Sequence, residues 1–269
     1  MKTSDWLKKY NIQLKKSLGQ NFLSTSEYAK KIVKKGSVTE EDTVIEIGPG
    51  AGTLTEEIAK TGAKLYAFEI DERLKPLLLE RFKEYQNVEI QFIDFLKANI
   101  SEIQKPKYIA NIPYYITSPI LEKIFFETPD FQLALLMVQK EYGERMMAKS
   151  GKNYSPLSIF VQFFCKVEKV LNVPPHAFIP NPKVDSVVLK LTPKEDIPDI
   201  NKKGFFKFVH VAFSQRRKTI RNNLKGLIKD RLDELLEKSD IDPKTRPENI
   251  SIEKFIILYN NYMKLKNDY

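Results

Sequence analysis

Residues 44–55 read VIEIGPGAGTLT, which is a β-branched strand run, a turn with glycine at every second position, and the start of a helix. Glycine is needed where the backbone turns sharply and must approach a ligand without an intervening Cβ. In an open α/β sheet, such a turn at the carboxyl end of a strand binds nucleotide-like molecules. The stretch therefore indicates a nucleotide-type site. The alternative is a generic strand-to-helix turn.

The spacing of this turn argues against two common nucleotide loops. A dinucleotide fingerprint requires Gly or Ala three residues after its second glycine, and here that position is Thr53. No Gly-Lys-Ser/Thr sequence follows, which excludes a phosphate-binding P-loop. The match to an NAD site is imperfect, and the ligand need not be a dinucleotide.

Strand and helix signals alternate on both sides of the turn. This alternation predicts βαβ units and a parallel sheet covered on both faces. We expect a late strand at 184–191, antiparallel at one end of the sheet. The strand runs are 43–48, 64–71, 88–94, 107–112 and 133–140, and the helix runs are 53–62, 72–85 and 118–127.

The chain divides near residue 195. Residues 192–204, TPKEDIPDINKKG, are polar, contain two prolines and a glycine, and are typical of a linker. Only helical signals follow. We predict an α/β domain over residues 1–194 and a small all-helical domain over residues 195–269.

Composition limits the classes of function. The 269 residues are 42% hydrophobic, enough for a sizeable core, and carry a net charge of +9. A basic surface attracts polyanions, most commonly nucleic acid, although lysine-rich solubility would give the same charge. Two histidines and one cysteine exclude a His/Cys zinc site, and Cys165, in an apolar run, is expected to be buried. No signal peptide or membrane span is evident, so we expect a cytoplasmic protein.

Two carboxylates follow successive strands after the glycine turn. Glu69 comes about twenty residues after the turn, where a carboxylate can accept hydrogen bonds from both ribose hydroxyls. Asp94 ends the next strand run, where it could meet an adenine amino group. Either residue alone is more simply a strand end or a helix cap. In this order they favour an adenosine-containing ligand.

The sequence NIPYYITS (111–118) follows the next strand and should lie on the same rim. The Asn111 side-chain oxygen and the Ile112 carbonyl can accept both hydrogens of an exocyclic amine and favour its pyramidal, nucleophilic form. Pro113 stiffens the loop, and Tyr114 offers a ring on which an extruded base can stack. The alternative is an ordinary strand-to-helix turn capped by Thr117 or Ser118.

Over nearly the whole chain, these blocks resemble the ribosomal RNA small-subunit adenine dimethyltransferases (the KsgA family). The matching blocks are LKKSLGQNFL (14–23), VIEIGPGAGTLT, NIPYYITSPI, FIPNPKVDSVVLKL (178–191) and FSQRRKTIRNNL (213–224). The resemblance implies a Rossmann-like methyltransferase domain with S-adenosylmethionine as donor and no metal. It also implies that two adjacent adenines of a small-subunit rRNA hairpin become N6,N6-dimethyladenine. We expect this rRNA within a 30S precursor, and nothing in the sequence requires more than a monomer.

The resemblance also assigns residues. Asn111 would bridge the donor and the target amine, and Phe178 would sandwich the target base against Tyr114. The alternatives are a core position for Phe178 and an ordinary N-terminal loop for SLGQNFL (17–23). Tyr115 is a position at which some relatives carry Asn. The implied donor contacts are Asn21, Leu23, Gly48, Gly50, Glu69, Asp94 and Asn111.

Basic residues suggest where RNA phosphates could bind. Arg217 and Arg221 are four apart and would share one face of a helix, beside Arg216 and Lys218. A solvated basic helix is the alternative for each. The N-terminal lysines Lys8, Lys9, Lys15 and Lys16 could add a basic arm.

Three other functions stay open at this point. One is a large-subunit rRNA methyltransferase of the antibiotic-resistance (Erm) type, which would share the donor loop and NIPY. The second is a noncatalytic RNA-binding or transcription factor on the same fold, because fold alone does not establish activity. The third is a dinucleotide-dependent oxidoreductase.

Overall fold

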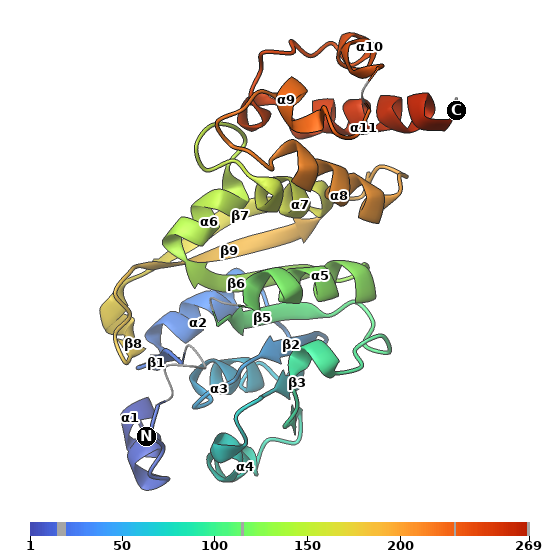
Figure 1. Cartoon of the computed structure of the whole chain (residues 1–269). Helices are drawn as coiled ribbons and strands as arrows, with labels where there is room; N and C mark the ends of the chain where they lie inside the picture. Colours follow the sequence, from blue (N-terminus) through green and yellow to red (C-terminus); the bar gives the residue numbers. More distant parts are fainter. Residues whose placement is uncertain (15–19, 114–115, 229, 268–269) are drawn as a thin grey trace. The chain divides into compact units, whose positions relative to one another are not determined.

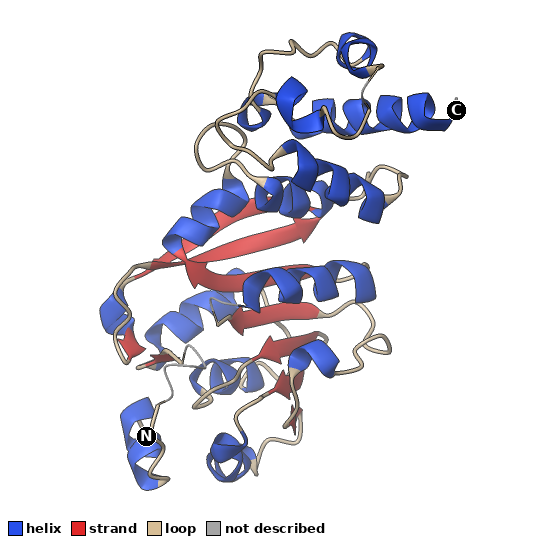
Figure 2. Ribbon diagram, in the orientation of Figure 1, coloured by secondary structure: helices blue, strands red, loops and turns tan. Residues whose placement is uncertain are grey.

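A seven-stranded mixed sheet forms the centre of the N-terminal part of the chain (Figures 1 and 2). The structure is a computed structural model that describes residues 1–14, 20–113, 116–228 and 230–267. The strand order is β4-β3-β2-β5-β6-β9-β7. The strands are β2 (Thr43–Ile47), β3 (Lys64–Phe68), β4 (Val88–Gln91), β5 (Lys107–Asn111), β6 (Leu133–Gln139), β7 (Cys165–Val173) and β9 (Ser186–Pro193).

Parallel pairing brings the carboxyl ends of four neighbouring strands to one edge. β2 pairs in parallel with β3 and β5, and β3 pairs in parallel with β4. β6 extends the parallel series beyond β5. These are the strands that the alternating sequence pattern predicts, and the α/β fold class is confirmed.

Helices form at the three positions predicted between the strands, and further helices before residue 36 and between residues 140 and 164 were not predicted. In chain order the helices are α1 (Thr3–Lys9), α2 (Ser26–Lys35), α3 (Thr53–Ala59), η2 (Glu72–Leu74), α4 (Lys75–Phe82), η3 (Phe95–Lys97), α5 (Thr117–Glu127), α6 (Lys140–Met147), α7 (Pro156–Phe164), η5 (Pro175–Ala177), α8 (Lys202–Ala212), α9 (Ile220–Leu224), α10 (Leu232–Lys238), η6 (Pro247–Asn249) and α11 (Ile252–Asn267). Ile116, and neither Thr117 nor Ser118, occupies the N-cap position of α5.

Two strand pairings were not expected from the sequence. β9 is antiparallel to β6 as predicted, but it lies inside the sheet, because β7 forms the edge beyond it. The β7 sequence, CKVEKVLNV, carries charges on an edge strand, so its hydrophobic signal is weak. A second, two-stranded sheet joins β1 (Phe22–Leu23) to β8 (Phe178–Ile179).

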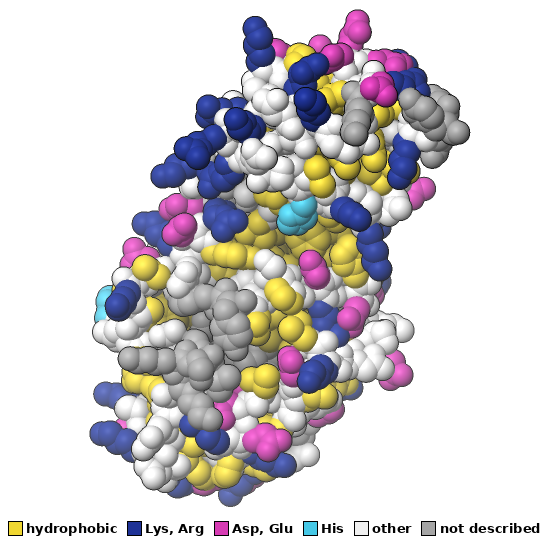
Figure 3. All heavy atoms as spheres, in the orientation of Figure 1, with side chains coloured by type: hydrophobic (Ala, Val, Ile, Leu, Met, Phe, Trp, Pro, Cys, Tyr) yellow, Lys and Arg dark blue, Asp and Glu magenta, His cyan; other side chains and the backbone are white. Residues whose placement is uncertain are grey.

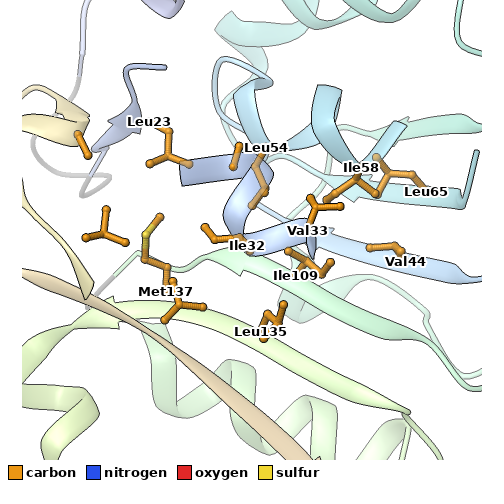
Figure 4. Close-up of a cluster of buried hydrophobic side chains, with 14 of the residues drawn as sticks. Leu23, Ile32, Val33, Val44, Leu54, Ile58, Leu65, Ile109, Leu135 and Met137 are labelled. Atoms are coloured by element: carbon orange, nitrogen blue, oxygen red, sulfur yellow. The ribbon is translucent and has the colours of Figure 1, made fainter. Parts of the chain in front are cut away.

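One face of the main sheet packs against α2 and α3 (Figure 4). Because strand side chains alternate between faces, β2 directs Val44 and Glu46 to this side and Ile45 and Ile47 to the other. The cluster also includes Cβ-branched and Leu side chains of the helices and the neighbouring strands, namely Ile32, Val33, Leu54, Ile58, Leu65, Ile109 and Leu135.

An aromatic chain covers the opposite face. Phe68 contacts Phe95 with ring centroids 5.6 Å apart, Phe95 contacts Tyr108 at 6.4 Å, and Tyr108 contacts Phe131 at 6.1 Å. The Tyr108 hydroxyl is hydrogen-bonded to the Thr128 hydroxyl at 2.6 Å, which satisfies its polar group within the core.

Two compact units make up the chain. The first contains Met1–Gly143 and Lys166–Pro193, and the second contains Glu144–Cys165 and Lys194–Tyr269. The predicted division near residue 195 is close to the boundary between the two units at residues 193 and 194. However, residues 144–165, which include α7, belong to the same unit as the C-terminal helices. The Phe163 ring of α7 packs against Phe205 and Phe206, with centroids 5.4 and 5.3 Å apart.

The C-terminal helices correct one prediction about the basic residues. α8 ends at Ala212 and α9 begins only at Ile220, where the Thr219 side chain accepts a hydrogen bond from Asn222 N. Arg217 therefore lies in the connecting turn, and it shares no helical face with Arg221.

Cys165 is buried, as its apolar surroundings in the sequence predict. Among the described residues, no helix combines the length and the apolar character needed to cross a membrane.

We expect Gly52→Ala to destabilise the protein more than Gly48→Ala. Both glycines have positive φ, +84° and +71°, so each alanine carries a left-handed strain of about 1–2 kcal/mol. A Cβ on Gly52 would also lie 2.6 Å from the Phe82 ring, whereas a Cβ on Gly48 would meet nothing within 4 Å. Overpacking should add about 1–3 kcal/mol to the loss.

Urea unfolding of the ligand-free variants measures both losses. Equal losses of unfolding free energy in the two variants would contradict the close packing of Gly52 against Phe82.

Candidate active site

A cavity of about 200 Å³ lies at the carboxyl ends of β2, β3 and β5, within the first compact unit. Five segments of the chain form its walls, as expected for the rim of a parallel sheet: 20–22, 47–50, 68–70, 94–96 and 111–113 together with 116. Of the residues that the sequence analysis selected, those that line the cavity are Asn21, Gly48, Gly50, Glu69, Asp94, Asn111, Ile112 and Pro113.

The glycine turn forms the floor of this cavity. Gly48 N donates to Phe68 O at 2.9 Å, which ties the turn to β3. A Cβ placed on Gly48 would have no other atom within 4 Å, so this side of the glycine is open. A Cβ on Gly50 would lie 2.6 Å from the Phe22 ring, so glycine allows the segment around Phe22 to lie directly on the turn.

Glu69 is fixed by two backbone N–H groups. Its Oε2 accepts from Gly50 N at 2.9 Å and its Oε1 from Asp71 N at 2.8 Å. Only 4% of the residue is exposed, and burial raises the pKa of this carboxyl group despite these hydrogen bonds. A carboxylate oriented this firmly at the cavity wall is suited to accept hydrogen bonds from ligand hydroxyls.

Asp94 lies three residues beyond the end of β4. Its Oδ1 accepts from Leu96 N at 3.0 Å and caps η3, so the structural alternative that the sequence allowed is correct. The residue also lines the cavity, and a carboxylate has a second oxygen. The two interpretations are therefore compatible.

Asn111 is the last residue of β5, and its side chain crosses to the N-terminal segment. Its Nδ2 donates to Asn21 O at 2.8 Å. This bond fixes the orientation of the amide, so that its oxygen Oδ1 can accept hydrogen bonds from other groups. Ile112 N donates to Met137 O at 3.2 Å and so anchors the start of the loop to β6. The predicted stacking residue Tyr114, like Tyr115, lies outside the described residues.

Two predicted site residues have other positions. Leu23 does not line this cavity but lines a small one beside it, together with Gly48 and Asn111. Its side chain is buried in the core, and its carbonyl accepts from Thr3 Oγ1 at 2.6 Å. Phe178 is opposite Leu23 in the β1–β8 pair and is 1% exposed within the same core cluster. Its ring has no exposed face on which a base could stack, so Phe178 is not part of the proposed base-binding surface.

Glu46 is a buried carboxyl that the sequence analysis did not select. It is 1% exposed, lines a small cavity beside Gly48 and Asn111, and its Oε2 makes no hydrogen bond with the described residues. Burial raises its pKa to about 8. A carboxyl in the middle of an otherwise apolar strand, VIEI, was the signal that could have identified it.

Fold and site together define a class. A Rossmann-like sheet with a glycine turn, a buried carboxyl group and an Asn-Ile-Pro loop on one rim is characteristic of S-adenosylmethionine-dependent methyltransferases. The described residues contain no group of three or more His, Cys, Asp or Glu side chains placed to hold a metal ion.

Comparison with known proteins narrows the class to one family. The family profile described as "Ribosomal RNA adenine dimethylase" matches residues 11–264, and the chain belongs to this family. It is 49% identical over 261 residues to the Ribosomal RNA small subunit methyltransferase A of Thermotoga neapolitana, covering 97% of this chain and 96% of that protein. The protein of the same name from Levilactobacillus brevis is 43% identical, with 97% and 94% covered.

Solved structures agree with this assignment. A dimethyladenosine transferase from Plasmodium falciparum superposes with a TM-score of 0.81 at 32% identity, covering 90% of this chain and 98% of that chain. The 23S rRNA methyltransferase ErmE gives a TM-score of 0.71 at 24% identity, covering 90% and 100%, a likeness of fold alone. The family assignment removes the dinucleotide-dependent oxidoreductase from the alternatives.

We expect the ligand-free protein to lose stability as pH rises toward 8, and Glu46→Gln to reduce that loss. A folded-state pKa of about 8 against an ordinary 4.5 means that the unfolded chain releases this proton first. Between these values Glu46 lowers the free energy of unfolding by about 1.4 kcal/mol per pH unit.

Urea unfolding at pH 6 and pH 8 tests this expectation, with the exposed Glu141→Gln as the control. The same pH dependence in the Glu46 variant and in the control would contradict a raised pKa at Glu46.

Proposed function

We propose that this protein transfers methyl groups to the N6 atoms of two adjacent adenines in a hairpin of small-subunit ribosomal RNA. Membership of the ribosomal RNA adenine dimethylase family and relatives named for the small subunit support this choice over a large-subunit target. The observation that carries it is the position of Asn111. Its amide lies on the rim of the donor cavity and is oriented by the bond to Asn21 O.

The residues around the cavity fit S-adenosylmethionine. The open side of Gly48 leaves space for the methionine part of the donor to lie against the backbone. Glu69 is oriented to accept from the ribose hydroxyls, and Asp94 is on the wall where an adenine amino group would donate. When bound, the donor supplies an electrophilic methyl group on a sulfonium.

The target amine needs acceptors more than it needs a base. Its lone pair is delocalised into the adenine ring, which makes the nitrogen flat and weakly nucleophilic. Asn111 Oδ1 and Ile112 O, as acceptors for its two hydrogens, favour a pyramidal nitrogen whose lone pair is directed out of the ring plane. Its proton becomes acidic once the new N–C bond forms, so no strong general base is required.

Pro113 and Tyr114 complete the proposed base site. Pro113 has a fixed φ, and its carbonyl accepts from Ile116 N at 3.2 Å. In this proposal Tyr114 stacks on the extruded adenine.

Exposed cations near α9 are the proposed contacts to RNA phosphates. Arg216, Arg217 and Lys218 are exposed in the turn before α9, and Lys and Arg side chains are numerous on the face shown in Figure 3. Arg221 is already paired, because its Nε and Nη2 donate to Asp233 at 2.8 and 2.9 Å. Arg217 and Lys218 are therefore the better candidates for contacts to RNA.

Three finer parts of the proposal rest on the family resemblance. The substrate is a partly assembled 30S precursor, the enzyme acts as a monomer, and it works in the cytoplasm.

Incubation of unmethylated small and large ribosomal subunits with the protein and S-adenosylmethionine should give dimethyladenine only in small-subunit rRNA, detected by mass spectrometry. Asn111→Ala should lower the rate at least about 100-fold, because acceptors oriented toward the reacting group are lost. The exposed Asn99→Ala should retain activity.

Methylation of large-subunit rRNA alone would favour the antibiotic-resistance type of target. A wild-type protein that binds RNA and transfers no methyl would favour a noncatalytic RNA-binding role. An active Asn111→Ala variant would disprove the assigned chemistry.

Affinity for small-subunit rRNA should fall steeply with salt, and replacing Arg217 and Lys218 together by Gln should reduce the slope of log K against log salt by about one per lost phosphate contact. Arg221→Gln should change it less, because Asp233 already engages that guanidinium. Filter binding between 50 and about 200 mM salt covers the range in which such contacts are lost. Equal slopes for all three proteins would exclude this turn from the RNA interface.

A further inference from the structure

Asp71 is a buried carboxylate whose two oxygens are both engaged beside the donor cavity. It is 5% exposed, and its Oδ1 accepts from Arg73 Nε at 2.8 Å. Its Oδ2 accepts from Arg73 Nη2 at 2.5 Å and from Gln20 Nε2 at 2.7 Å. Burial opposes ionisation, but these hydrogen bonds hold the pKa of Asp71 below its ordinary value. Asp71 is thus a charged acceptor in the folded protein.

Arg73 connects this carboxylate to a second point on the N-terminal segment. Its Nη1 donates to Gln13 O at 2.9 Å while its other nitrogens hold Asp71. The Arg73–Asp71 pair therefore binds the N-terminal segment at Gln13 and at Gln20. A planar guanidinium can make these bonds at once, and an ammonium group cannot reproduce the geometry.

The residue that follows Gln20 contributes directly to the site. Asn21 lines the cavity, and its carbonyl accepts from Asn111 Nδ2 at 2.8 Å. On the other side, the Asp71 backbone N–H donates to Glu69 Oε1 at 2.8 Å. Asp71 is therefore linked both to the carboxylate that faces the ligand and to the segment that forms the opposite wall.

Other contacts already keep the N-terminal segment folded. Phe22 and Leu7 belong to an apolar cluster with Ala51 and Leu77, and Thr3 Oγ1 bonds to Leu23 O. Loss of the polar pair should leave these contacts in place. The pair is thus better suited to orient the cavity wall than to hold the fold together.

We propose that Asp71 and Arg73 are positioning residues that align residues 20–21 with Glu69 and thereby set the affinity for the methyl donor. Neither side chain needs to touch the donor. The identity of that ligand rests on the proposed function, whereas the linkage between the two cavity walls rests on the hydrogen bonds themselves. The pair fixes the spacing between the Asn21 wall and the Glu69 wall before the ligand arrives, which lowers the ordering cost of binding.

The test compares Arg73→Met and Arg73→Lys with a matched control, Arg231→Met, in the full chain. Arg231 makes the same kinds of contact in the second unit, a carboxylate pair with Glu234 and a bond to Leu265 O. Calorimetric titration with S-adenosylmethionine should give about tenfold weaker binding for Arg73→Met, an intermediate value for Arg73→Lys, and wild-type affinity for Arg231→Met.

Steady-state kinetics gives a second readout. Arg73→Met should raise the KM for the donor while kcat at saturating donor stays within about twofold, because Asn111 and Ile112 are unchanged. Wild-type donor affinity in Arg73→Met, or equal weakening in Arg73→Met and Arg231→Met, would overturn the inference. A wild-type protein that fails to bind S-adenosylmethionine at all would instead overturn the proposed function.

Discussion

The left-handed backbone of the 48–52 turn is the constraint on which the rest of the site depends. Gly48, Gly50 and Gly52 all have positive φ, so the turn can bend away from β2. Its N–H groups can then donate hydrogen bonds, and other groups can pack against its glycine α-carbons. Gly50 uses both properties, since its N–H holds Glu69 and its α-carbon lies against Phe22. A side chain at this position would separate the N-terminal segment from the sheet and open the donor cavity.

In the proposed reaction, the sheet contributes geometry rather than strongly reactive groups. Parallel strands place Glu69, Asp94 and Asn111 on one rim, although they are distant in the sequence. None of them has to act as a powerful acid or base. Each presents an oxygen at a defined place, and a reaction whose difficulty lies in the shape and direction of an amine lone pair needs little more.

The strands and the order of the site residues could be predicted from local sequence signals. The features that could not be predicted depend on contacts between distant parts of the chain. The alternation of strands and helices was visible in the sequence pattern. The site residues could be found because each one lies at or just after the end of a predicted strand, namely the glycine turn, Glu69, Asp94 and Asn111. The edge strand β7 was missed because exposed charges interrupt its apolar pattern. Leu23 and Phe178 pair with each other although they are 155 positions apart in the sequence, so their pairing had no local signature. The break between α8 and α9 was missed as well, although Thr219 caps the start of α9.

The β1–β8 pairing has a consequence for how the protein matures during its own synthesis. Phe22 lines the donor cavity, yet the strand partner of residues 22–23 is residues 178–179 of a 269-residue chain. While the chain emerges from its N-terminus, the early βαβ units can collapse, but this wall stays without its partner until about two-thirds of the polypeptide has left the exit tunnel. A nascent chain therefore gains its cofactor pocket late, as a product of long-range closure rather than of its first folded segment.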